Sequence, residues 1–153
     1  MAIDSAELIG TIGRLGLALL LGSAIGFERQ WHRKMAGLWT NALVALGACG
    51  FVVFSDMVGQ GDPTRIAAQV VSGIGFLGAG VIVHGARTQR VHGLTTAACT
   101  WLTACLGTVC GFAHPPLIVI AIVLTLAVLI FGGPIERWFR SRLPPPDDNP
   151  GVS

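Results

Sequence analysis

The chain has 153 residues, of which 52% are hydrophobic and 12% charged, and its mean hydropathy is +0.69. This composition excludes an ordinary soluble domain of this length. The formal net charge is only +2, and the charged residues lie in short clusters between uncharged runs, which is typical of a membrane protein with several spans. No nucleic-acid partner is expected.

Five apolar segments predict an all-α membrane bundle that occupies residues 1–139. The predicted transmembrane helices cover residues 6–27, 40–58, 65–83, 94–113 and 116–133. Each is close to the ~20 residues that a helix needs to cross the hydrocarbon core. The N-terminus lacks the basic region of a cleavable signal peptide, so the first span is expected to be retained.

The basic residues predict the orientation of the bundle. They occupy alternate linkers, and eight of the ten lysines and arginines therefore lie on one side. The positive-inside rule makes that side cytoplasmic, with the N-terminus outside and the C-terminus inside. A reporter fused after Arg142 should behave as cytoplasmic, and one in the Gly59–Asp62 linker as external.

The first predicted span contains a charge and a small-residue motif. Arg14 lies one to two turns inside the span, where a charge is costly. Its side chain either snorkels to the outer interface, or lines a polar cavity, or pairs with another helix. Gly22 and Gly26 form a GxxxG pattern, which allows two helices to approach closely.

Polar residues lie on both sides of the first linker. Glu28 and Arg29 end the first span, and Thr40 and Asn41 begin the second. We interpret Glu28 and its basic neighbours as an interfacial ion pair, and Thr40 and Asn41 as caps of the second helix. All four are candidate functional residues.

The third predicted span holds four glycines and a glutamine. At about 100° per residue, one side of this helix carries small residues: Ala68, Ser72, Gly75 and Ala79. The other side carries larger ones: Val70, Ile74, Leu77 and Val81. We interpret the small residues as the packed face, the larger ones as the lipid face, and this helix as the centre of the bundle.

Two polar residues lie at the outer end of the third span. Gln69 is inside the span, where its amide must find hydrogen-bond partners. It either joins helices or binds a ligand. Asp62, two turns before it, is a further candidate functional residue.

The last two predicted spans differ in character. The fourth is small or hydroxylated over most of its circumference and is expected to be buried. It contains a second GxxxG pattern, Gly107 to Gly111, and two candidate functional residues, Thr95 and Thr96. The fifth is almost purely aliphatic and is expected at the lipid-facing periphery. The four cysteines are interpreted as small buried hydrophobes.

Residues 140–153 are rich in proline and are expected to form a disordered cytoplasmic tail.

The remaining features argue against catalysis. The sequence shows no nucleophile–base pair, phosphate-binding loop or metal motif, and no carboxylate near the middle of a span. It therefore predicts neither an enzyme, nor a cofactor, nor a metal site.

Four stretches carry a resemblance to a known family. They are Arg14–Arg29, Ala36–Gly47, Asp62–Gly80, and Val91–Ala98 with Trp101. In this order they resemble the membrane domain of the MgtC/SapB family of bacterial inner-membrane proteins. The family usually has arginine where this chain has Trp39, so an interaction through that arginine is not expected here.

The resemblance implies a multi-pass inner-membrane protein linked to magnesium homeostasis, to acid or envelope stress and to virulence. Some members of the family bind and restrain other membrane proteins. We therefore expect a regulatory or partner-binding role, with the lipid bilayer and another membrane protein, or a second copy of the chain, as partners. The alternative is a small oligomeric ion transporter or channel whose pathway follows the third helix.

Overall fold

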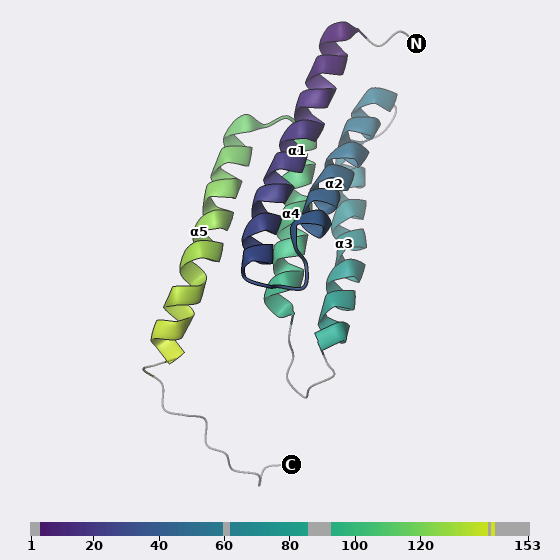
Figure 1. Ribbon diagram of the computed structural model, residues 1–153. Helices are drawn as coiled ribbons and strands as arrows, with labels where there is room; N and C mark the ends of the chain where they lie inside the picture. Colours follow the sequence, from purple (N-terminus) through teal and green to yellow (C-terminus); the bar gives the residue numbers. More distant parts are fainter. Residues whose placement is uncertain (1–3, 60–61, 86–92, 141, 143–153) are drawn as a thin grey trace.

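The computed structural model describes residues 4–59, 62–85, 93–140 and 142, and these form five helices without any strand. The helices are α1 (Ser5–Trp31), α2 (Leu38–Val58), α3 (Pro63–Gly85), α4 (Leu94–Gly111) and α5 (Pro115–Arg140) (Figure 1). All five are long and apolar enough to span a membrane. The predicted all-α bundle of five spans is confirmed, whereas its orientation stays a prediction.

Two helix ends lie well beyond the predicted ones, whereas the other boundaries agree within two residues. Helix α1 continues to Trp31, four residues past its predicted end, and α5 continues to Arg140, beyond residue 133. The predicted disordered tail falls almost wholly outside the described residues, because only Arg140, at the end of α5, and Arg142 belong to them.

Asp62 starts α3 as its N-cap. Its Oδ1 accepts hydrogen bonds from the backbone N–H and the hydroxyl of Thr64, at 2.9 and 2.7 Å. Pro63 takes the first helical position, where its missing N–H costs nothing. These bonds hold the pKa of the Asp62 carboxyl below its usual range, first through the hydroxyl and then through the backbone. The candidate functional residue Asp62 therefore has a structural role.

We expect Asp62→Ala to lower the unfolding midpoint in detergent by a few degrees, because α3 loses its cap. Asp62→Asn, which can still accept the bond from the backbone of Thr64, should lose less. A carboxyl whose pKa is depressed by folding stabilises the folded state above its unfolded pKa of about 4. The difference in unfolding midpoint between wild type and Asp62→Asn should therefore vanish as the pH falls below the pKa of the Asp62 carboxyl in the folded protein. A difference that persists at low pH would contradict the cap.

Helix α4 lies at the centre of the bundle and contacts all four other helices (Figure 1). Half of its membrane segment is buried, against 6% for α3. The expectation that α3 is the central helix is wrong, because among the described helices α3 packs on α4 and α2 alone. The expectations for α4 and α5 agree with the structure, since α5 is only 11% buried.

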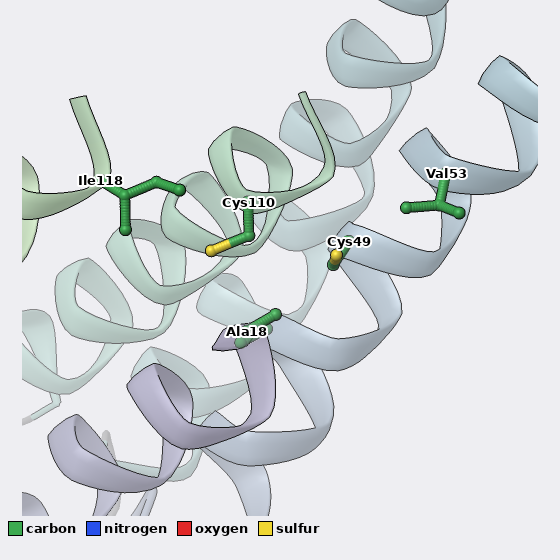
Figure 2. Close-up of a cluster of buried hydrophobic side chains, with 6 residues drawn as sticks. Ala18, Cys49, Val53, Cys110 and Ile118 are labelled. Carbon is green, nitrogen blue, oxygen red and sulfur yellow. The ribbon is translucent and has the colours of Figure 1, made fainter. Parts of the chain in front are cut away.

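Small side chains fill the core between α1, α2, α4 and α5. Figure 2 shows five members of one buried cluster, Ala18 of α1, Cys49 and Val53 of α2, Cys110 of α4 and Ile118 of α5. Cys49, Cys99 and Cys110 are buried free thiols and act as small hydrophobes, whereas Cys105 is exposed.

Two glycines bring α1 against α2. A Cβ atom at Gly22 would lie 2.8 Å from the Cβ of Ala45, and one at Gly26 would lie 2.6 Å from the Cα of Leu38. Contacts this short do not occur between real side chains and backbone, so any larger residue would push the helices apart.

Two further glycines bring α4 against α2. A Cβ at Gly107 would collide with the backbone carbonyl of Ala45, and one at Gly111 would lie 2.6 Å from the Cβ of Val52. Helix α2 is therefore held between the glycine faces of α1 and α4, which is the close packing that small residues permit in membranes.

The predicted faces of α3 are wrong for Ile74 and for the small residues, whereas Leu77 is exposed as expected. Ile74 is 7% exposed and packs with Ala48 of α2 and Ala104 of α4. The small residues that were expected to pack are exposed: Ala68, Ser72, Gly75 and Ala79. A Cβ at Gly75 would meet nothing within 4 Å. We call these four residues the small-residue flank of α3.

Candidate functional site

Arg14 joins three helices at the end of the bundle that holds the N-terminus. Its Nη1 donates to Oδ2 of Asp56 at 3.1 Å and to the carbonyl oxygen of Gly111 at 3.2 Å. Asp56 lies in the last turn of α2 and Gly111 is the last residue of α4, while more than two turns of α1 precede Arg14. Of the arrangements open to Arg14, the structure has the pairing with another helix. The charge lies at the edge of the bundle, where it costs less than at its middle.

Arg29 lies at the opposite end and is 4% exposed. Its Nη2 donates to Oγ1 of Thr96 on α4 at 3.1 Å. Within the described residues, Nε of Arg29 and Oε2 of Glu28 are buried without a hydrogen-bond partner. Glu28 pairs instead with its helix neighbour His32, whose Nδ1 lies 3.0 Å from Oε1. The expected interfacial ion pair is wrong for Arg29, which is a buried link between α1 and α4.

Asn41 is fully buried between α2 and α4 and does not cap α2. The N-cap is Gly37, without a side-chain cap bond. The Asn41 amide donates to the carbonyl oxygens of Ala36 and Gly37, at 3.3 and 2.9 Å, and its Oδ1 accepts from Thr103 at 3.0 Å. It therefore ties the loop before α2 to the central helix. The expected capping role is wrong, because the helix begins three residues before Asn41.

The remaining candidates lie at the surface of the bundle. Thr40 and Thr95 are exposed. Gln69 is also exposed and lines a groove of about 580 Å³ between α2 and α3. It is the one polar side chain on that groove, whose walls are otherwise aliphatic, aromatic or glycine.

A second hollow, of about 360 Å³, lies on the other side of α3, against α4. Five residues of α3 line it, and three of them are small: Gly75, Gly78 and Ala79. Ala97, Ala98 and Trp101 line it from α4. Gly75 and Ala79 belong to the small-residue flank, so the flank continues into this hollow.

The candidate residues thus do not converge on one site. Arg14, Arg29 and Asn41 each join two or more helices, at different levels of the bundle. Such links fix the order of the helices and offer no open cluster for chemistry. The small-residue flank of α3 and the hollow beside it carry small or apolar residues, which suits contact with another helix or with lipid.

Two partners were missed from the sequence, Asp56 and Thr103. The register of α1 and α2 predicts that Asp56 lies beside Arg14. Arg14 lies 17 residues before the end of α1, and Asp56 lies 18 residues after the start of α2. In an antiparallel pair with equal rise per residue, these two side chains lie level.

Comparison with known proteins decides the family. The family model for the MgtC family matches residues 15–138. The chain belongs to the MgtC family. No solved structure matches it.

Curated relatives named Protein MgtC match about two-thirds of the chain. Protein MgtC of Brucella abortus (strain 2308) is 56% identical over 102 residues, which are 66% of this chain and 42% of that protein. Protein MgtC of Salmonella typhimurium (strain LT2) is 55% identical over 97 residues, 63% of this chain and 41% of that protein. The chain thus spans about two-fifths of the length of these curated relatives. Membership of this family and five helices long and apolar enough to span a membrane make the chain a multi-pass membrane protein.

Proposed function

We propose that this chain is a regulatory protein of the bacterial inner membrane that acts in magnesium homeostasis and in acid or envelope stress. It works by binding a transmembrane helix of another membrane protein. The single observation that supports this proposal is the exposed small-residue flank of α3 beside the hollow between α3 and α4.

The flank has the chemistry of a helix-packing surface. Ala68, Ser72, Gly75 and Ala79 recur every three or four residues, so they lie on one line along α3. Small residues in such a line let two backbones approach in lipid, where apolar area alone gives no driving force between helices. Within this chain the close contacts are made by the glycines of α1 and α4, which leaves the flank of α3 free for a second protein.

The groove between α2 and α3 is the place to examine for the alternative function, ion transport. Its walls are apolar apart from Gln69. A hydrated magnesium ion favours carboxylate and water ligands. This lining therefore supports contact with lipid or protein in preference to a path for the ion.

Reconstitution tests the choice between these functions. Purified protein in liposomes should give no magnesium flux above that of empty vesicles, because the chain acts on a partner that is absent there. Saturable magnesium uptake that is lost in Gln69→Ala would contradict the proposal and favour transport along α3.

Substitutions on α3 separate folding from partner binding. Ile74→Ala should destabilise the bundle by about 2 kcal/mol or more, because Ile74 is buried against α2 and α4. Gly75→Leu should leave the unfolding midpoint nearly unchanged, because a Cβ there meets nothing within 4 Å and the residue is exposed. It should nevertheless abolish the response of cells to low magnesium that depends on the partner.

Gly80→Leu is the matched control. It adds the same side chain to the same helix at another open position away from the flank, and it should keep both stability and function. Equal losses of function in Gly75→Leu and Gly80→Leu would mean that the flank is not the binding surface.

A further inference from the structure

An apolar groove of about 350 Å³ runs between α1 and α5, apart from the surface of α3. Leu17 and Leu21 of α1 and Ile122 of α5 line its walls, with Cys110 and Ile118 deeper in the bundle (Figure 2). Helix α5 lies at the edge of the bundle (Figure 1), and the groove reaches the surface, because Leu17 and Val119 on its walls are exposed.

The groove has a charged mouth. Arg14 lines it and also lines a small polar hollow of about 80 Å³ with Asp56 and Gly111. Both bonds of Arg14 come from Nη1 alone. Among the described residues, nothing accepts from its Nε or Nη2, and nothing donates to Oδ1 of Asp56. The ion pair therefore keeps free donors and a free acceptor, and the side chains of Arg14 and Asp56 are 33% and 61% exposed.

The position of the pair in the bundle matches the level expected for lipid head groups. It is level with the ends of α2 and α4, whereas the groove extends from it toward the middle of the bundle. A ligand at this position would have its polar part on the ion pair and its apolar part along α1 and α5. A phospholipid has these two parts, a polar head group and apolar acyl chains.

We propose that this site binds a zwitterionic phospholipid with a primary ammonium in its head group. The phosphate accepts charge-assisted hydrogen bonds from Nε and Nη2 of Arg14, whose planar guanidinium presents two parallel donors. The ammonium donates to Oδ1 of Asp56, and one acyl chain lies in the groove. An anionic head group without an amine would satisfy Arg14 and leave the exposed carboxylate of Asp56 facing a second negative charge.

Native mass spectrometry of the full chain with equal amounts of phosphatidylethanolamine and phosphatidylglycerol tests this site. The wild type should retain phosphatidylethanolamine about tenfold over phosphatidylglycerol, the ratio expected for one added charge-assisted bond. Asp56→Asn should bring the ratio close to one, because the amide no longer attracts the ammonium. Equal retention of the two lipids by the wild type would overturn the proposal, as would an unchanged ratio in Asp56→Asn.

A second variant tests the groove without touching the ion pair. Gly13 lines the groove, and a Cβ there meets nothing within 4 Å, so Gly13→Phe fills the groove without a clash in the chain. It should lose retention of both lipids at least about tenfold, whereas Gly16→Phe, also in open space but outside the groove, should retain them. Retention of lipid by Gly13→Phe at the wild-type level would exclude the groove as the place of the acyl chain.

Discussion

Gly107→Ala is expected to cause the largest loss of folded protein that a single added methyl group can cause in this bundle. The new Cβ would collide with the backbone of Ala45 on α2, and a backbone cannot move aside as a flexible side chain can. Overpacking typically lowers the free energy of unfolding by about 1–3 kcal/mol, and the loss caused by Gly107→Ala should reach or exceed the upper end of this range. The unfolding midpoint in detergent and the fraction of monodisperse protein measure the effect.

Gly75→Ala is the control for this prediction. It adds the same methyl group to a helical glycine whose Cβ position is open, so its only effect is the better helix propensity of alanine. Similar losses in Gly107→Ala and Gly75→Ala would mean that α2 and α4 do not pack as closely as the structure has them.

Thr96→Val should also destabilise the bundle strongly, although it preserves the shape of the side chain. The hydroxyl of Thr96 accepts the one hydrogen bond that the buried Arg29 makes with another helix. Without it, a buried guanidinium loses its partner, which costs about 1–3 kcal/mol or more for a charged group. Thermal or denaturant unfolding in detergent measures the change, and Thr96→Ser, which keeps the hydroxyl, should lose much less.

The double variant Thr96→Val with Arg29→Met checks the cause. An apolar residue at position 29 leaves no unpaired charge, and replacing both partners of a buried polar contact is often nearly neutral. The double variant should therefore be more stable than Thr96→Val alone. If the second substitution only adds to the loss, the destabilisation has another source than the unpaired guanidinium.

The sequence was sufficient to predict those features that depend on hydropathy and residue size. It located all five spans, because each is an apolar segment of membrane length between charged linkers. It also placed α4 inside and α5 outside, because small hydroxylated residues suit close packing and aliphatic residues suit lipid.

It did not predict the faces of α3, and the reason is physical. In a soluble helix the solvent-facing side is polar, so periodicity identifies the buried side. In lipid both sides are apolar, and a line of small residues shows only that a helix can be approached closely. Whether the approaching helix belongs to the same chain is decided by the rest of the bundle. Here Ile74 faces α4, and Gly75 faces outward.

The polar links were missed for a related reason. Arg29 and Asn41 lie near helix ends, where a charged or amide side chain ordinarily reaches water or caps a helix. Their burial follows from Gly26, which lets the start of α2 lie directly on the last turns of α1. Such contacts between distant residues cannot be derived from either segment alone.

Site-specific photocrosslinking in native membranes tests the central claim most directly. A photoreactive residue in place of Ser72, on the small-residue flank, should give one discrete adduct with another membrane protein. The adduct should disappear when Gly75→Leu is added and persist with Gly80→Leu. The same residue at Ile120, which is exposed on α5, should give no such adduct. Adducts with lipid alone, an adduct of twice the mass of the chain, or equal protein adducts from both positions would contradict a regulatory partner on α3.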